Sequence, residues 1–137
     1  KDLLELKCDV LAPCAISHQI TLGNADNIKA KIIIEMANAP IAPPADPALN
    51  KKGIIVLPDI LANSGGVIVS YFEWLQNLKN ETWQEDDVIK KLEEKITGSF
   101  KEVFVKSKEK SCDLRTAANI VAIDRILLAE RQRSYLL

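Results

Sequence analysis

Hydrophobic and polar positions follow two different rhythms along the chain, and the change comes near residue 60. Before that point, short aliphatic runs end at proline or asparagine, and they occupy residues 8–12, 32–36 and 54–57. Their nearly continuous apolar character is typical of strands buried on both faces of a parallel sheet. Polar segments at 24–30 and 44–52 have helical character, and Gly53 stops the second one. This alternation predicts βαβ units with right-handed crossovers.

The rest of the pattern predicts three long helices, because apolar residues recur there every three or four positions. The first helix is expected to start near Asn63 or Ser64, the second to cover residues 85–107 and the third residues 114–133. The stripe expected to be buried on the first helix consists of Val67, Ile68, Tyr71, Phe72, Leu75 and Leu78. The fold class is therefore α/β, with about three to four strands of a doubly wound parallel sheet followed by long C-terminal helices.

Composition and charge exclude two classes of partner, nucleic acids and membranes. The chain has 137 residues, 47% hydrophobic and 27% charged, which fits a soluble globular domain with a sizeable core. Its 18 basic and 19 acidic residues give a formal net charge of −1, so the usual electrostatic argument for nucleic acid or an anionic membrane is missing. No apolar run approaches the roughly 18 residues that span a bilayer. We expect no nucleic-acid partner and no membrane partner.

The cysteines and the histidine limit the chemistry further. Cys8, Cys14 and Cys112 are an odd number and form no CxxC pair, which indicates reduced thiols in a cytoplasmic protein. Each is expected to be a small buried hydrophobe rather than a nucleophile, because no base is near it in sequence. The single histidine, His18, excludes a site with several histidine ligands and is expected on a surface or in a loop.

The residues that follow the three predicted strands are the candidates for chemistry. In an open parallel sheet, ligands bind beyond the carboxyl ends of the strands. Ala15 follows the first strand, Asn38 follows the second, and Asn63, Gly65 and Gly66 follow the third and open a helix. Small residues let a flat ligand approach the backbone, and an amide donates and accepts at once, as a carboxamide or a ribose requires. These residues predict a small-ligand site, with free N–H groups at the helix start suited to a carboxylate or phosphate.

Simpler explanations exist for the same residues. Asn, Gly and Pro at strand ends are mostly turn-forming residues, and Asn63 would serve equally as a helix N-cap. Ser70 reaches a ligand if its helix face lines the cleft, but a helical serine usually bonds to its own backbone. Glu35 is unusual in an apolar run and indicates either a polar neighbour at the cleft or an edge position. The sequence has no GxGxxG, no P-loop and no evident triad, so the residues alone predict no particular reaction.

Residues 53–77 closely resemble the cofactor domain of the glutamate dehydrogenases, in the string GIIVLPDILANSGGVIVSYFEWLQN. The similarity continues in the same order through CDVLAPCAISHQIT at 8–21, KAKIIIEMANAP at 29–40 and LRTAANIVAIDRI at 114–126. The family resemblance implies a Rossmann-like fold, NAD or NADP as cofactor, L-glutamate and 2-oxoglutarate as partners, and a homo-oligomer. It also implies that the chain is the later part of the cofactor domain, with residues 1–62 as its strand-rich half and 63–137 as its helical half.

The resemblance assigns roles residue by residue. Those it places at the cofactor are Ala15, Asn38, Asn63, Gly65 and Gly66. Asn63 would also face the substrate, and Ser70 matches the serine that binds the distal carboxylate of glutamate. Relatives that act on apolar amino acids usually have an aliphatic residue there, so Ser70 favours glutamate. The chain departs from the family pattern at Cys14, His18, Ala39 and Ile41.

In this family the catalytic lysine and aspartate belong to another domain, and the glycine fingerprint precedes the matching segment. Because the chain starts at Lys1 on an apolar run and has neither feature, we expect a fragment that is inactive alone. Two alternatives stay open: a free-standing, non-catalytic domain that binds a nucleotide or a partner, and a dehydrogenase of another amino acid.

Overall fold

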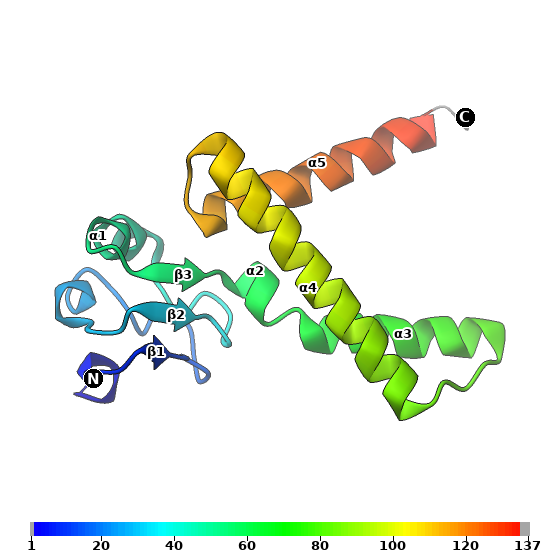
Figure 1. Cartoon of the computed structure of the whole chain (residues 1–137), viewed down its shortest axis with the longest axis horizontal. Helices are drawn as coiled ribbons and strands as arrows, with labels where there is room; N and C mark the ends of the chain where they lie inside the picture. The colour runs from blue at the N-terminus through cyan, green and yellow to red at the C-terminus, as the bar shows by residue number, and fades with distance from the viewer. Residues whose placement is uncertain (1, 135–137) are drawn as a thin grey trace.

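The computed structural model describes residues 2–134 and contains a three-stranded parallel sheet (Figure 1). The strands are β1 (Val10–Leu11), β2 (Ile32–Ile34) and β3 (Ile55–Leu57), in the order β1-β2-β3. Ile32 of β2 pairs with Val10 on one side and with Ile55 on the other. The three predicted strands and their parallel arrangement are therefore confirmed, although each strand is shorter than its apolar run.

The two crossovers carry short helices. A 3₁₀ helix, η1 (Asp2–Glu5), precedes β1, another, η2 (Ala25–Asn27), lies between β1 and β2, and η3 (Pro43–Ala45) continues into α1 (Asp46–Lys51) before β3. These two crossover segments match the helical segments expected at 24–30 and 44–52. They bury one core against the sheet, formed by Ile20, Ala25, Ile28, Ala30, Ile33, Ile41, Ala45, Leu49, Ile54 and Val56. The crossovers cover one face of the strands. Val10 and Ile55 are 49% and 52% exposed on the other face, so the predicted burial of the strands on both faces is wrong for β1 and β3.

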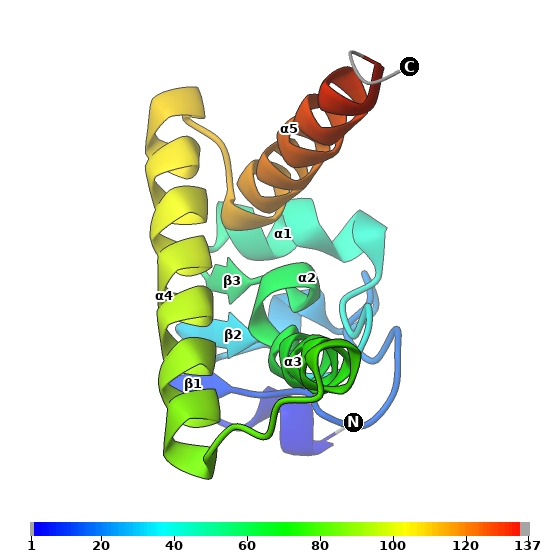
Figure 2. The same ribbon diagram turned by 90° about the vertical axis from the view of Figure 1, so that its right-hand side faces the viewer.

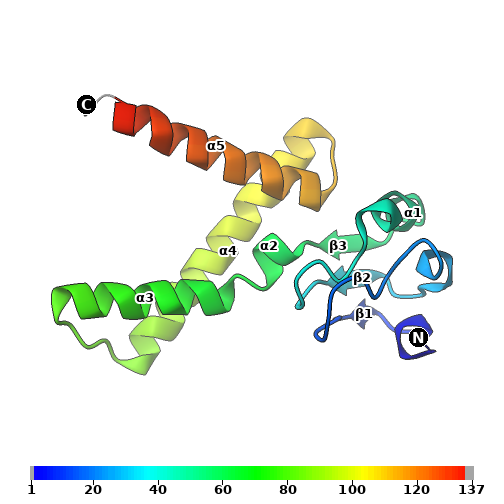
Figure 3. The ribbon, with the colours of Figure 1, turned by 180° about the vertical axis from the view of Figure 1, so that it is seen from behind.

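Four helices follow the sheet. They are α2 (Asp59–Ala62), α3 (Gly65–Lys79), α4 (Glu85–Lys110) and α5 (Leu114–Ser134). Figures 1 and 3 show that α3 points away from the carboxyl ends of the strands and that α4 runs back past α2 to the start of α5. Figure 2 shows the molecule from the right-hand side of Figure 1, with α4 running past the strands and α5 on the same side of the sheet as α1. A second, smaller core joins α2, α4 and α5 through Leu61, Val103, Ala117, Ala118 and Val121.

The predicted buried stripe of α3 is only partly correct. Phe72 is buried, but Val67 is 74% exposed, and Tyr71 and Leu78 are also exposed. The physical reason is that α3 packs against α4 along one face, and the other face has no cover within residues 2–134. The spacing of apolar residues predicted a buried stripe that is wider than the face of α3 in contact with α4.

No helix within residues 2–134 has both the length and the apolar character needed to cross a membrane.

Gly53 ends α1 in the way the sequence predicts. Its φ is +73°, and the N–H groups of Gly53 and Ile54 donate to the carbonyl oxygens of Asn50 and Leu49 at 2.9 and 3.1 Å. A glycine in the left-handed region is the usual way to end a helix, because it has no Cβ to strain the backbone.

We expect Gly53→Val to lower the free energy of unfolding by about 1–2 kcal/mol, because a β-branched residue is strained in this conformation. No atom lies within 4 Å of the Cβ that it would add, so backbone strain and not collision is tested. Gly98→Ala within α4 is the control and should raise stability by up to about 1 kcal/mol. Chemical denaturation of the folded protein measures both, and an unchanged midpoint for Gly53→Val would contradict the role of Gly53.

Candidate functional site at the carboxyl edge of the sheet

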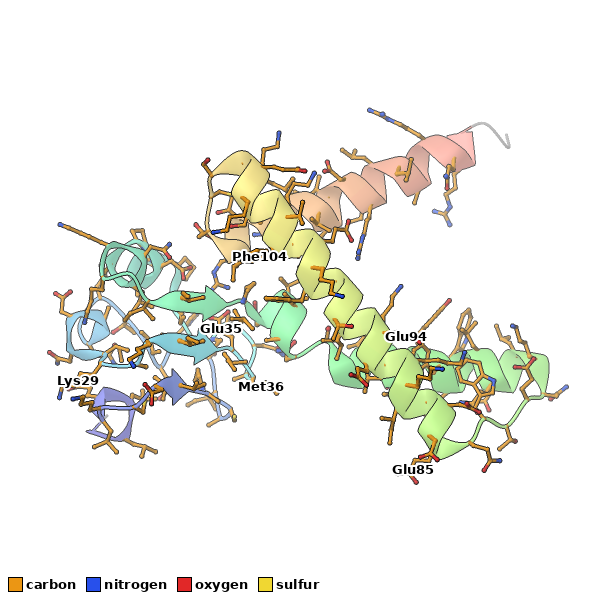
Figure 4. All side chains as sticks on the ribbon, in the orientation of Figure 1. Lys29, Glu35, Met36, Glu85, Glu94 and Phe104 are labelled. Carbon is orange, nitrogen blue, oxygen red and sulfur yellow. The ribbon has the colours of Figure 1, made fainter. Side chains whose placement is uncertain are left out.

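The loops that follow the three strands meet at one edge of the sheet. The N–H of Ala37 donates to the carbonyl oxygen of Pro13 at 2.8 Å, which joins the loops after β1 and β2. The N–H of Glu35 donates to Leu57 at 3.1 Å, which joins the end of β2 to β3. Figure 4 shows Glu35 and Met36 at this carboxyl end of β2. The backbone itself therefore brings the three predicted strand ends together.

Ala15 and Asn38 lie at one hollow on this edge. Its lining comes from the loops after β1 and β2, as Ala15, Ile16, Ser17, Met36, Ala37 and Asn38. Ala15 and Asn38 are both exposed, whereas Ala37 is buried beneath the hollow. The lining combines the small side chains of Ala15, Ser17 and Ala37 with the larger ones of Ile16 and Met36.

Asn38 and Asn63 contact each other directly. The Nδ2 of Asn63 donates to the Oδ1 of Asn38 at 2.8 Å, so the loop after β2 is joined to the turn after α2. Ser64, and not Asn63, occupies the N-cap position of α3, and neither side chain caps that helix. The alternative that Asn63 serves only as a helix N-cap is therefore wrong. The pair keeps one amide donor group and one amide acceptor oxygen for a ligand.

Gly65 faces α4, whereas Gly66 and Ser70 lie on an open face of α3. A Cβ built on Gly65 would lie 3.6 Å from the Cδ1 of Ile96 on α4, whereas Gly66 faces open space. Ser70 is four residues beyond Gly66 and therefore on the same face of the helix. It is exposed, and its hydroxyl has no hydrogen-bond partner within residues 2–134. The alternative that the Ser70 hydroxyl forms a hydrogen bond with the backbone of its own helix is thus wrong. Ser70 lies about 7 Å along the axis from the start of α3 and forms no hydrogen bond with the other candidates.

The sequence analysis missed Arg115, which binds three carboxylates at this edge. Its Nη1 and Nη2 lie 2.8 Å from the two oxygens of Glu35, and its Nε lies 2.8 Å from Oδ2 of Asp46. The Nη1 atom is also 3.5 Å from Oδ1 of Asp59. We call Arg115, Glu35, Asp46 and Asp59 the Arg115 cluster. It joins the first turn of α5 to the residue that follows β2, to α1 and to α2.

The Arg115 cluster continues into the candidate site through hydrogen bonds. Oε2 of Glu35 accepts the N–H of Asp59 at 2.8 Å, and Oδ2 of Asp59 accepts the N–H of Ala39 at 2.8 Å. Glu35 is completely buried and follows the central strand of the sheet, so the alternative that it lies at an edge of the sheet is wrong. The alternative that it faces a polar neighbour is confirmed, because Arg115 is that neighbour. A glutamate in an apolar run was the available signal. Its partner was not visible, because Arg115 is 80 residues away along the chain.

Burial sets the electrostatics of the Arg115 cluster. Desolvation raises the pKa of Asp46 above its usual value, against the opposing hydrogen bond and charge of Arg115. Burial alone would lower the pKa of Arg115, but its hydrogen bonds to Glu35 and Asp46 outweigh that effect and raise it. The guanidinium therefore keeps its charge despite its partial burial.

The remaining reactive side chains lie apart from this arrangement. Cys8 and Cys112 are partly buried against the two cores, but Cys14 is exposed, so the expectation of a buried thiol is wrong for Cys14. His18 is exposed on a loop, as predicted, and its backbone N–H donates to Ala39 at 2.8 Å. In the part of the chain that the structure describes, no group of three or more His, Cys, Asp or Glu side chains is arranged to hold a metal ion.

The family model described as Glutamate/Leucine/Phenylalanine/Valine dehydrogenase matches residues 1–134. The chain belongs to this family. NAD-specific glutamate dehydrogenases of Staphylococcus aureus strains COL and MSSA476 are 47% identical to this member over 135 residues, which is 98% of the chain. The chain spans 33% of the length of these relatives.

Solved structures confirm the fold of this family member. A glutamate dehydrogenase from Peptoniphilus asaccharolyticus matches with a TM-score of 0.85 and 40% identity, covering 90% of this chain and 31% of that one. The hetero-hexameric glutamate dehydrogenase from Thermus thermophilus matches with a TM-score of 0.92 and 30% identity, over 96% of this chain and 32% of that one. An L-tryptophan dehydrogenase from Nostoc punctiforme matches with a TM-score of 0.77 and 28% identity, over 95% and 37%. The predicted Rossmann-like α/β class and the glutamate dehydrogenase resemblance are both confirmed.

We expect Glu35→Gln to lower the free energy of unfolding of this dehydrogenase-family chain by about 3–5 kcal/mol, because it removes one partner of a buried ion pair. Glu94→Gln is the matched control, since Glu94 is an exposed carboxylate on α4, as Figure 4 shows. The control should change stability by less than about 0.5 kcal/mol. Denaturant titration followed by circular dichroism compares the two, and equal effects would contradict the burial argument.

Proposed function

We propose that this chain carries one wall of the cofactor and substrate site of a longer glutamate dehydrogenase. That enzyme would convert L-glutamate to 2-oxoglutarate and ammonia, with NAD as the oxidant. The observation that carries the proposal is the Asn38–Asn63 hydrogen bond at the edge of a family-matched sheet, with the exposed hydroxyl of Ser70, unpartnered within residues 2–134, on the next helix. The specificity named in the relatives at 47% identity favours NAD over NADP.

Each candidate residue has a role that fits its surroundings. We assign the hollow beside Ala15 and Asn38 to the nicotinamide end of the cofactor, because an amide and several small side chains line part of it. When bound, the nicotinamide ring would accept hydride from the substrate. Asn63 would orient the carboxamide or the substrate, and Gly66 would leave room at the start of α3. Gly65 faces Ile96 of α4, where an added Cβ would make only an ordinary contact at 3.6 Å, so any contribution to the cofactor site would come from its backbone.

Ser70 would determine which amino acid is accepted. An exposed hydroxyl with no partner in the described chain is suited to donate to the distal carboxylate of glutamate. A second candidate, a dehydrogenase of another amino acid, is favoured by the match to an L-tryptophan dehydrogenase. The two candidates differ in whether the substrate side chain is charged, and Ser70 is the position that distinguishes them.

We further propose a cytoplasmic homo-oligomer. Reduced cysteines support the compartment, and the described structure contains three free cysteines. Exposed apolar side chains on α3 and α5 support association, since Val67, Trp74, Leu78, Ile126 and Leu128 are each more than half exposed. The related enzyme from Thermus thermophilus is a hetero-hexamer.

In the full-length protein, Ser70→Ala should lower kcat/KM for glutamate by about ten- to a hundredfold, because a hydrogen bond to a charged group is lost. The value for leucine should stay the same or rise. Ser99→Ala on α4 is the matched control, since Ser99 is a helical serine outside the candidate site. Steady-state assays with both amino acids measure the ratio. A wild-type preference for leucine would remove the assigned role of Ser70 and favour the second candidate.

The chain of 137 residues by itself should show no glutamate-dependent reduction of NAD and no more than weak cofactor binding. The family resemblance places the catalytic lysine and the glycine fingerprint in the part of the enzyme that precedes the matching segment. Isothermal titration calorimetry with NAD and with NADP measures the affinity of the chain for each cofactor. Micromolar affinity for either cofactor would contradict the prediction and would support the free-standing nucleotide-binding alternative.

A further inference from the structure

We propose that Arg115 is a positioning residue for the candidate site: from α5, it holds the loop that carries Asn38 in register with the turn that carries Asn63. The inference rests on the proposed function for its kinetic consequence. Arg115 itself touches no candidate ligand-binding residue, and it acts through Glu35 and Asp59.

The path from Arg115 to Asn38 consists of short contacts. Arg115 holds both oxygens of Glu35 at 2.8 Å, and Oε2 of Glu35 accepts the backbone N–H of Asp59 at 2.8 Å. The carboxylate of Asp59 then accepts the backbone N–H of Ala39 at 2.8 Å. Asn38 precedes Ala39 directly, so the last of these bonds fixes the peptide that joins them.

The loop after β2 needs such support because its backbone is strained. Ala39 has a φ of 45°, in the left-handed region, which costs roughly 1–2 kcal/mol for a residue other than glycine. Its N–H is held by Asp59, and its carbonyl oxygen accepts the N–H of His18 at 2.8 Å. If Asp59 no longer accepted the N–H of Ala39, the backbone of Ala39 would be expected to leave the left-handed region, and the position of Asn38 would change with it.

The Arg115 cluster also fixes the position of Asn63, the hydrogen-bond partner of Asn38. Asp59 is the first residue of α2 and Asn63 follows its last, so this four-residue helix carries the position of one end to the other. Arg115 lies in the first turn of α5, and Ala117 and Ala118 two and three residues later are buried in a core with Leu61 of α2. Arg115 is therefore held at the place from which it reaches both sides of the Asn38–Asn63 bond.

A guanidinium is specifically required. Nη1 and Nη2 of Arg115 each lie 2.8 Å from an oxygen of Glu35, Nε lies 2.8 Å from Asp46, and Nη1 also lies 3.5 Å from Asp59. A lysine ammonium keeps the charge but is a single point, and it cannot hold Glu35 bidentately while it reaches Asp46. Arg115→Lys thus tests geometry at constant charge.

The experiment uses the full-length enzyme and compares Arg115→Lys with Arg125→Lys. Arg125 is the control because it lies on the same helix and pairs with Glu102 in an exposed ion pair. Hydrogen exchange by mass spectrometry follows the peptides that cover residues 36–42 and 57–62. We expect faster exchange in both peptides for Arg115→Lys and wild-type exchange for Arg125→Lys.

Kinetics test whether the loop matters for the reaction. We expect Arg115→Lys to lower kcat/KM for the nicotinamide cofactor by about tenfold, since a small misplacement of a binding group is sufficient for such a loss. In an Asn38→Ala background the same change should cost less than about twofold, because both substitutions then act on one contact. Arg125→Lys should leave kcat/KM unchanged in either background.

Each result decides the proposal. Unchanged exchange in 36–42, or independent and multiplicative effects of Arg115→Lys and Asn38→Ala, overturns it. If Arg115→Lys does not fold, the double change Arg115→Gln with Glu35→Gln replaces it, because it removes both members of the buried ion pair and leaves neither charge unpaired; faster exchange in 36–42 is still expected, and wild-type exchange there overturns the proposal. If the wild-type enzyme shows no reaction with glutamate, the proposed function fails, and the exchange of residues 36–42 alone supports or overturns the role of Arg115.

Discussion

The ion pair between Glu35 and Arg115 is the constraint on which the carboxyl edge of this sheet depends. A completely buried carboxylate is tolerated in a protein only when a cation and hydrogen-bond donors replace the water it has lost. Arg115 supplies the cation and the N–H of Asp59 supplies a further donor. The strand ends, α2 and the start of α5 therefore have one mutual arrangement in which this charge is satisfied.

The sheet and the helices illustrate what a single sequence can predict. Continuous apolar runs and the Gly53 stop located the strands and α1, because these signals are local. The buried face of α3 was harder to predict, since apolar spacing does not distinguish residues packed on α4, such as Phe72, from residues left open, such as Val67. That distinction depends on which surfaces this chain itself supplies.

The candidate site shows the same division. The meeting of Ala15, Asn38 and Asn63 followed from the rule that parallel strands end at one edge, and the Asn38–Asn63 bond agrees with it. The link to Arg115 did not follow from any local rule. Glu35 indicated that a partner exists, but a charge pair between residues this far apart along the chain leaves no periodicity or motif to read. Exposure of Cys14 was missed for a related reason, because burial at a strand end depends on the loop that covers it.

The long sequence separation in the Arg115 cluster has a consequence for how the chain matures. During synthesis, Glu35 leaves the ribosome 80 residues before Arg115 does, and for that interval its carboxylate must remain hydrated. The aliphatic core beneath the strands can form early, because its members lie within residues 20–56. The contacts of Arg115 with Glu35, Asp46 and Asp59 can form only after α5 has been synthesised, so this edge of the sheet is completed later than the core beneath it.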